Sequence, residues 1–199
     1  MPARATSRRP APPLPDELSG RQLARRERVV GAAIDLMLLR DYGEVQMKDA
    51  AAAGDVALGT MYRYFMSKDH LFAEALLRWS EGFPAEAAMP RSVRAVDRLK
   101  IAFRRAVRAF ERYPSVHSYI LALQMTTDPV AADIYARWSR LQNGAWATYL
   151  SKVPPGRRDD IVDVMGAVLD TNLRDWLLGK QPISAVYSKL DRTADLLLR

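Results

Sequence analysis

Apolar residues recur every three or four positions along this chain, the spacing that buries one face of an α-helix. In the first such segment, 21–40, the apolar face consists of Val29, Ala33, Leu36 and Met37. No segment shows the strict alternation of a half-buried strand, and no internal repeat is visible. The pattern therefore predicts an all-α protein.

The same spacing and the helix-start residues predict further helices over 47–53, 58–64, 91–113 and 157–178. Additional helices are expected to begin after Ser67, at Pro114, at Asp128-Pro129 and at Pro182. Segment 82–90 is expected to be a break, segment 154–156 a loop, and Gly179 a helix C-terminus.

Segment 91–113 is the most basic predicted helix. Its apolar side carries Val93, Val96, Leu99, Phe103, Val107 and Phe110. Its arginines are expected to lie largely elsewhere: Arg91, Arg94, Arg98, Arg105, Arg108 and Arg112. They form either a solvated face or a rim that attracts an anionic ligand or nearby DNA.

Residues 47–68 carry the most informative pattern, a short helix, a tight turn and a second short helix. Gly54 is expected to end the first helix because glycine adopts a positive φ without penalty. Val56 is expected to be the buried hinge of the turn. Two helices joined in this way are typical of the helix-turn-helix motif, whose second helix enters the major groove of DNA.

The run Val56–Lys68, VALGTMYRYFMSK, resembles the signature V-S-x-G-T-L-Y-x-x-F-x-S-K of the TetR family of transcriptional regulators. The resemblance covers roughly residues 21–80. Ala57 replaces the usual Ser at the helix N-cap, which costs about 1 kcal/mol locally, and Met66 replaces the usual Pro. More narrowly, residues 45–47 and 57–65 are similar to the actinobacterial repressors of cholesterol catabolism.

The resemblance implies a three-helix DNA-binding domain followed by a helical domain for ligand binding and dimerisation. The corresponding boundaries are a disordered basic arm over 1–20, the helix-turn-helix domain over 21–67 and the second domain over 68–199. The arm is rich in Pro, Ala and Arg. Either it has no role, or its arginines and those that follow touch DNA phosphates or the minor groove: Arg4, Arg8, Arg9, Arg21, Arg25 and Arg26.

The second helix of the motif supplies the candidate DNA contacts. Gly59 permits a close approach to the bases, and Thr60 offers a hydroxyl and a methyl group. The rings of Tyr62 and Tyr64 either donate hydroxyls to phosphate or pack in the core, where Phe65 is expected. The full set of expected contacts is Gln46, Lys48, Leu58, Gly59, Thr60, Tyr62, Arg63, Tyr64 and Lys68.

Composition supports a polyanionic partner and gives little support to catalysis. The 199 residues carry a formal charge of +7 and no Cys, which excludes disulfides and thiolate sites and fits a reducing cytoplasm. No apolar run approaches the roughly 20 residues of a membrane span. The only histidines are His70, expected at the surface, and His117, expected to be an ordinary helical residue. No catalytic, metal-binding or cofactor motif is present.

The second domain is rich in aromatic residues, which either fill the core or line an apolar cavity with few polar anchors. The candidate ligand-binding residues are Trp79, Phe83, Phe103, Phe110, Tyr119, Leu123, Gln124, Trp138, Asn172 and Trp176. Gln124, Thr171 and Asn172 are the candidate anchors. The closer resemblance implies a steroid or its coenzyme A thioester, that is, an acyl-CoA-like ligand.

The helices near 157–178 and 182–198 are expected to pack antiparallel and leave an apolar face that a second copy covers. A two-fold dimer places its recognition helices about 34–36 Å apart, or at a related separation, so the operator should be a near-palindrome. These observations predict a cytoplasmic, dimeric repressor that binds double-stranded DNA and is released by a small apolar ligand. The alternatives are a ligand-independent regulator and a helical lipid-binding or sensing protein without specific DNA binding.

Overall fold

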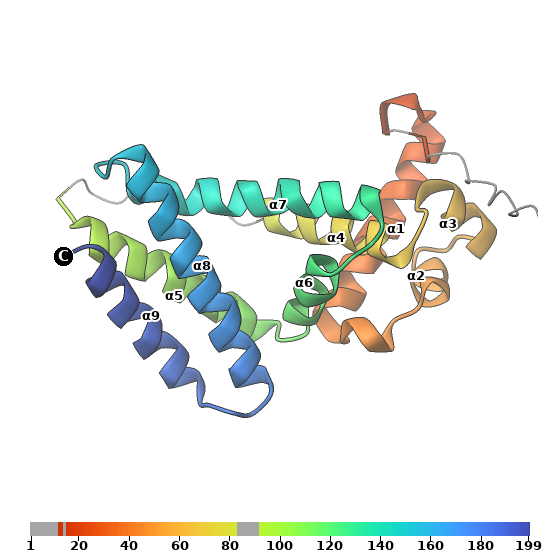
Figure 1. The fold of residues 1–199 in the computed structure, drawn as a ribbon. Coiled ribbons are helices and arrows are strands. Elements are labelled where there is room, and N and C mark those ends of the chain that lie inside the picture. Colours follow the sequence, from red (N-terminus) through yellow and green to blue (C-terminus); the bar gives the residue numbers. More distant parts are fainter. Residues whose placement is uncertain (1–11, 14, 83–91) are drawn as a thin grey trace, which may run out of the picture.

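The computed structural model describes residues 12–13, 15–82 and 92–199. These ranges contain helices and no strand, so the all-α prediction is confirmed (Figure 1). In order, the elements are η1 (Pro15–Glu17), α1 (Gly20–Leu39), η2 (Tyr42–Glu44), α2 (Met47–Ala53), α3 (Leu58–Tyr64), α4 (Lys68–Glu81), α5 (Ala95–Arg112), α6 (Val116–Gln124), α7 (Pro129–Thr148), α8 (Pro155–Leu177) and α9 (Ile183–Leu197).

Two hydrophobic clusters divide the molecule. The first joins α1, α2, α3 and α4 with parts of α6 and α7, and the second joins α5, α8 and α9 with the end of α7. In Figure 1, α1 to α3 lie at one end, α5, α8 and α9 lie at the other, and α7 runs along the molecule between them. Residues 15–82 are called the head below, and residues 92–199 the body.

The predicted helix starts at Ser67 and Asp128 have the expected caps. The Ser67 hydroxyl accepts a hydrogen bond from the His70 backbone N–H at 3.0 Å. A carboxylate oxygen of Asp128 accepts from the backbone N–H groups of Val130 and Ala131 at 2.9 and 3.3 Å. Each cap satisfies N–H groups that have no partner inside the helix. Gly179, expected as a helix C-terminus, follows α8 with a φ of +68°.

The turn between α2 and α3 is built differently from the prediction. Gly54 has a φ of −85°, and the positive φ of +50° belongs to Asp55. Glycine is favoured at 54 for another reason, because an added Cβ would lie 3.0 Å from Val29 Cγ2 and 3.1 Å from Val29 Cα, and α1 would have to shift by a few tenths of an ångström. The turn therefore packs directly on α1, and Asp55 adopts a conformation that Asp tolerates better than most residues.

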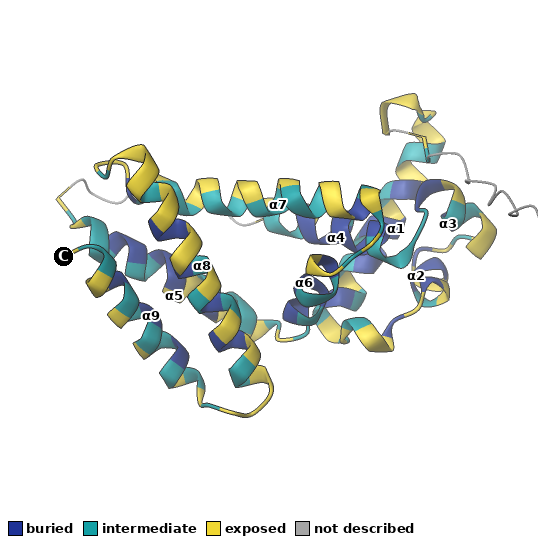
Figure 2. Ribbon diagram, in the orientation of Figure 1, coloured by how far each residue is buried: buried dark blue, intermediate teal, exposed yellow. Residues whose placement is uncertain are grey.

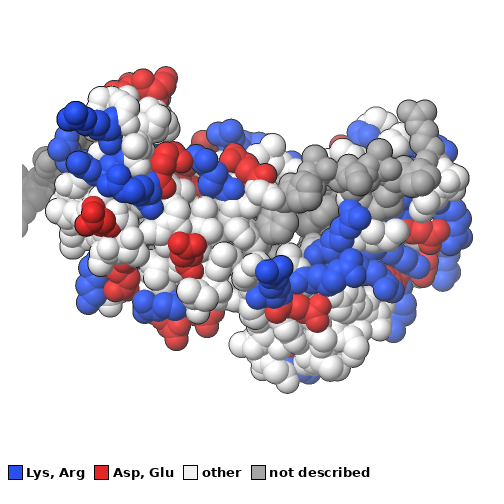
Figure 3. Space-filling view, turned by 180° about the vertical axis from the view of Figure 1, so that it is seen from behind, with Lys and Arg blue, Asp and Glu red and all other residues white. Residues whose placement is uncertain are grey.

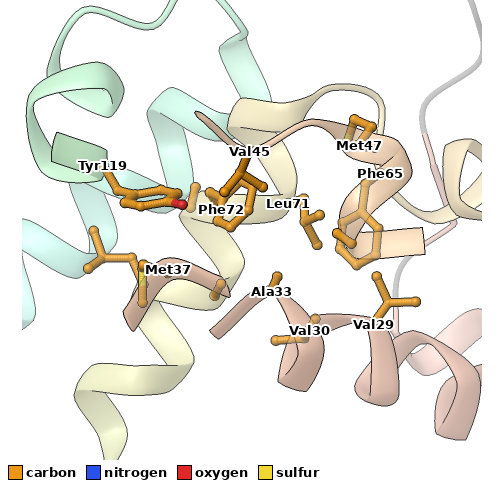
Figure 4. Close-up of a cluster of buried hydrophobic side chains, with 14 of the residues drawn as sticks. Val29, Val30, Ala33, Met37, Val45, Met47, Phe65, Leu71, Phe72 and Tyr119 are labelled. Atoms are coloured by element: carbon orange, nitrogen blue, oxygen red, sulfur yellow. The ribbon is translucent and has the colours of Figure 1, made fainter. Parts of the chain in front are cut away.

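The core of the head draws on helices that are far apart in sequence. Figure 4 shows Val29, Ala33 and Met37 of α1 facing Leu71 and Phe72 of α4, and all five are fully buried. Burying a side chain of this size contributes roughly 1.5–3 kcal/mol. The contacts therefore hold α4 against α1 and support the helix-turn-helix from behind.

Helix α6 is hydrogen-bonded to the head at three points. Ser115 Oγ donates to the Met37 carbonyl at 2.7 Å, Ser118 Oγ accepts from the Tyr42 N–H at 2.8 Å, and Tyr119 Oη donates to the Arg40 carbonyl at 2.9 Å. The Tyr119 ring is fully buried, with its centroid 4.7 Å from that of Phe72. Tyr119 was expected to contact ligand, and the structure instead places it in the junction between α6 and the head.

Two charged or titratable residues are buried where the sequence suggested exposure. His70 is 3% exposed, and its Nδ1 accepts a hydrogen bond from the Met66 N–H at 3.2 Å. Burial lowers the pKa of His70. Arg98 is 6% exposed, although it was expected on the solvated side of its helix with the other arginines. The predicted arm over 1–20 falls largely, and the predicted break over 82–90 almost wholly, outside the described residues.

Candidate nucleic-acid interface

Helix α3 has a buried face and an open face. Met61 and Tyr64 are 0% and 5% exposed, and they pack into the head together with Phe65, which follows the helix. The opposite face presents Leu58, which is 42% exposed, together with Gly59 and Arg63. The buried face explains why so short a helix is held in place, since seven residues alone do not form a stable helix in water.

A polar hollow of about 300 Å³ lies at the start of α3. Arg25 and Arg28 of α1 line one part of it, and residues 55–57 and Thr60 line the rest. Both arginines are exposed. Seen from behind, Lys and Arg side chains are interspersed with Asp and Glu over the whole face, and the widest band of positive side chains lies on the body (Figure 3). Positive charge beside the open face of α3 suits a DNA backbone.

Tyr64 and Lys68, both expected to contact DNA, are engaged within the protein. The Tyr64 ring is buried edge-on against Phe65, with the centroids 6.5 Å apart. Lys68 Nζ donates to the Tyr42 carbonyl and lies 3.7 Å from the centroid of the Tyr42 ring. Burial lowers the pKa of Lys68. Of the two roles considered for Tyr64, phosphate contact and core packing, the structure shows core packing. Lys68 points toward η2.

The other expected contacts remain at the surface. Tyr62 and Thr60 are half-buried, whereas Gln46 and Lys48 at the start of α2 are exposed. The Gln46 backbone N–H donates to the Asp49 carboxylate at 2.8 Å, so this N–H group is already hydrogen-bonded within the protein.

The residues expected to bind ligand do not form one site. Phe103 stacks on Trp146 at a centroid distance of 4.5 Å in the second hydrophobic cluster, and Trp176 packs against the same cluster. Asn172 is buried, and its amide donates to the Val168 carbonyl at 2.7 Å and accepts from Gln181 at 3.0 Å. Asn172 therefore holds the α8–α9 turn in this structure, and its role as a ligand anchor stays a prediction. Phe83 lies outside the described residues.

Part of the expected set does gather between α4, α5, α6 and α7. The Trp79 ring contacts Tyr113 at 6.3 Å, and Phe110 contacts His117 at 5.9 Å between centroids. Trp138 stacks on Tyr135 at 5.3 Å. Leu123 is buried, and Gln124 is exposed at the end of α6.

Sequence reasoning missed a polar group between α6, α7 and α8. His117 is 1% exposed, and its Nε2 lies 3.2 Å from Asp170 Oδ1. The interaction with His117 lowers the pKa of Asp170 against the opposing effect of burial. Both ring nitrogens of His117, and Trp138 Nε1, are buried without a well-aligned hydrogen bond, so Nε2 and Asp170 form a close polar pair only. No sequence spacing links His117 with Asp170, so only the packing of α6 on α8 reveals the pair.

The described residues offer no metal site, because no three His, Asp or Glu side chains among them are grouped to bind a cation. None of the helices in the described ranges combines the length and the apolar content that crossing a bilayer requires. The positive charge near α3 is local, because it comes from Arg25, Arg28 and Arg63, whereas residues 15–82 as a whole carry slightly more Asp and Glu than Lys and Arg.

Comparisons with known proteins agree with this geometry. Residues 29–75 match the model of the bacterial regulatory proteins of the tetR family. The chain is 30% identical over 187 residues to the HTH-type transcriptional repressor KstR of Rhodococcus jostii (strain RHA1), covering 92% of this chain and 87% of the relative. The KstR repressor of Mycobacterium tuberculosis (strain ATCC 25618 / H37Rv) is also 30% identical, over 182 residues, covering 89% of this chain and 82% of the relative.

Solved structures share the fold. A TetR transcriptional regulator from Rhodococcus sp. RHA1 superposes with a TM-score of 0.74 at 26% identity, covering 89% of this chain and 97% of that chain. Thermus thermophilus FadR, solved in complex with lauroyl-CoA, has a TM-score of 0.70 at 19% identity, covering 87% of this chain and 93% of that chain.

Proposed function

The chain belongs to the TetR family of bacterial regulatory proteins, and from this premise we propose how it acts as a transcriptional repressor. In this proposal, two copies bind a near-palindromic operator through their α3 helices. A small apolar ligand, a steroid or an acyl-CoA-like thioester, enters the body and releases the DNA.

The open face of α3 is the observation that carries the proposal. Leu58, Gly59 and Arg63 on this face are exposed, whereas Met61 and Tyr64 on the opposite face are buried in the core of the head. Docking this face in the major groove brings the polar hollow, with Arg25 and Arg28 on its rim, beside a phosphate strand. The proposed contacts are Gln46, Lys48, Leu58, Gly59, Thr60, Tyr62 and Arg63, with Arg25 and Arg28 added from the hollow.

The outer side of α8 and α9 supports a homodimer. Val164, Leu177 and Leu178 on or next to α8 are 43%, 38% and 61% exposed, and Leu196 on α9 is 63% exposed. Figure 2 shows exposed positions along both helices. Covering such apolar side chains with a second copy removes them from water, and a two-fold four-helix bundle is the simplest arrangement that does so.

The ligand proposal rests on the buried groups that lack partners. Trp138 Nε1 on α7 is a donor without a partner, and His117 Nδ1 on α6 also lacks a partner, with its ring against that of Phe110. Buried polar groups are nearly always hydrogen-bonded, so a carbonyl or hydroxyl oxygen on an apolar skeleton suits this place. The Asp170 carboxylate repels an anion, so the phosphates of a thioester ligand would lie elsewhere.

Helix α6 offers a route from ligand to DNA. It carries His117 on the side of α8, and its residues 115–119 are hydrogen-bonded to the head. A ligand that prefers a different position of α6 relative to α8 would reorient the head. Release requires only that ligand bind this second arrangement more tightly. A 100-fold loss of operator affinity corresponds to about 2.7 kcal/mol of coupling.

A fluorescence-anisotropy titration on near-palindromic fragments from the DNA beside the gene tests the proposal. Lauroyl-CoA and a steroid coenzyme A thioester serve as the two ligand probes. Specific binding that one probe reverses supports both parts of the proposal. Specific binding that ignores both probes keeps the repressor and discards these ligands.

Tyr62→Ala and Tyr64→Phe form a matched pair for the DNA surface. Tyr62 lies beside the open face, so its loss should weaken operator binding at least tenfold while dimerisation is unchanged. Tyr64→Phe keeps the buried ring and removes only the hydroxyl, so operator affinity should stay within twofold. A large loss of operator affinity with Tyr64→Phe would instead support the phosphate contact that the sequence predicted for the Tyr64 hydroxyl.

A further inference from the structure

At the N-terminus of α3, three successive residues have side chains that cannot form hydrogen bonds. Ala57, Leu58 and Gly59 are all exposed, and Leu58 is the large apolar side chain among them. In the helix-turn-helix domain, residues at the start of the second helix lie closest to the base edges. Three non-polar residues therefore stand where hydrogen bonds to bases are commonly made.

Leu58 and Tyr62 share the open face, since they are four residues apart on one helix. Met61, which lies between them in sequence, is fully buried on the other side. A Cβ built on Gly59 would meet no atom within 4 Å, so the surface beside Leu58 is open. The exposed Leu58 side chain therefore lies on the open side of α3, next to the half-buried Tyr62, whose ring also packs against the core of the head.

An aliphatic side chain in the major groove can distinguish the C5-methyl group of thymine from the donors and acceptors on the other base edges. Donors and acceptors on the base edges lose their water against leucine and gain nothing in return, which costs free energy. The C5-methyl group of thymine instead gains from apolar contact. We propose that Leu58 reads the methyl group of one thymine in each half-site of the operator. This inference rests on the proposed function, because it requires α3 in the major groove.

Replacing thymine with deoxyuridine tests the inference, because it removes the methyl group and leaves the base pairing unchanged. The full chain first selects its operator from random duplex DNA. Each thymine pair related by the two-fold axis is then replaced, and affinity is measured by fluorescence anisotropy. At one thymine position, the replacement should weaken binding by about fourfold for each half-site, which corresponds to the free energy of burying one methyl-sized group.

Three variants decide whether Leu58 is responsible. Leu58→Ala should bind the thymine and deoxyuridine operators equally at that position, whereas Leu58→Met should retain most of the difference. Leu39→Ala is the matched control, because Leu39 is an 80% exposed leucine of the head outside α2 and α3. It should leave the difference unchanged. Both positions, Leu58 and Leu39, are exposed, so we expect all three variants to fold, and circular dichroism verifies it.

The inference is overturned if no thymine position responds to the methyl group, or if Leu58→Ala retains the full response. The second result would assign the methyl contact to another side chain, such as Thr60. A chain that selects no sequence at all would refute the proposed function, and the inference would fall with it. Sequence-specific binding without any methyl dependence would refute the inference alone.

Discussion

The head and the body treat their buried polar side chains differently. In the head, Arg26 Nη2 lies 2.7 Å from Glu74 Oε1, and its guanidinium lies 5.0 Å from the centroid of the Phe65 ring. In the body, Arg98, His117, Trp138 and Arg158 each carry a buried nitrogen without a hydrogen-bond partner. Among the described residues, every such unpartnered side-chain atom belongs to the body.

The difference shows where each part is incomplete. The interior of the head satisfies its own polar groups, and what remains open is the outer face of α3. The body covers its surface with paired charges, such as Arg94 with Asp97 and Lys100 with Asp195, and leaves polar atoms unpaired inside. A complete interior suits a rigid part that binds a partner on its surface, and an incomplete interior suits a part that encloses a ligand.

Arg26→Met should give the largest effect, because it breaks a buried ion pair and leaves Glu74 without its partner. We expect a loss of about 3 kcal/mol in the free energy of unfolding. Chemical denaturation followed by circular dichroism measures it. Arg78→Met is the control, since the Arg78–Glu27 pair is about half exposed and should contribute less than about 1 kcal/mol. Equal effects of the two substitutions would show that the buried Arg26–Glu74 pair stabilises the head no more than the exposed Arg78–Glu27 pair does.

Arg98→Met is the same substitution in the body, and it should raise the free energy of unfolding instead of lowering it. Removing a buried guanidinium whose Nε and Nη2 have no partner relieves a desolvation cost, so we expect a gain of about 1–2 kcal/mol. The same denaturation experiment measures it. A loss of more than about 1 kcal/mol would mean that Arg98 has a partner in solution, and the contrast between head and body would fail at this residue.

Local signals explain what the sequence predicts well. The bounds of α2 and α3 follow from an alanine-rich run, a glycine turn and a recognisable motif, and the structure confirms both. The cap at Asp128 also needs only adjacent residues. Gly54 was correctly placed in the turn but for the wrong reason, because its contact with Val29 depends on the packing of α1.

Contacts between distant segments explain what the sequence misses. Tyr119 bonds to the Arg40 carbonyl, and Asn172 accepts from Gln181. Both were expected to bind ligand because an aromatic or polar residue on an apolar helix face has several uses. Arg98 was assigned to the solvated face because arginine is rarely buried. The outward direction of Leu58 likewise follows only from the burial of Met61 and Tyr64.

Gly59→Ala separates the stability of the head from its surface function. The added methyl group meets no protein atom, and alanine favours helix more than glycine, so unfolding should cost up to about 1 kcal/mol more. The same methyl group lies on the open face of α3 and should weaken operator binding. Thermal denaturation and anisotropy are measured on one preparation. Unchanged operator affinity would show that the bases do not approach α3 closely at residue 59.

Asp170→Asn tests the polar group in the body through acid stability, and its effect should be the smallest. The close interaction with His117 lowers the pKa of Asp170, burial opposes it, and Gln124 and Arg174 add to the lowering. A carboxylate with a depressed pKa stabilises the fold above its ordinary pKa, and this stability is lost as pH falls through the folded value. Wild type should therefore lose stability more steeply than Asp170→Asn below about pH 4.

The size of that effect follows from the exposure of the carboxylate. The Asp170 side chain is 29% exposed while His117 is 1% exposed, so solvent screens one partner of the pair and not the other. We expect a difference below about 1 kcal/mol at neutral pH that vanishes in acid. Asp133→Asn, at an exposed position of α7, is the control and should leave the acid profile unchanged. If Asp170→Asn also leaves the profile unchanged, the carboxylate does not stabilise the free protein, and its contact with His117 would then matter only when ligand is bound.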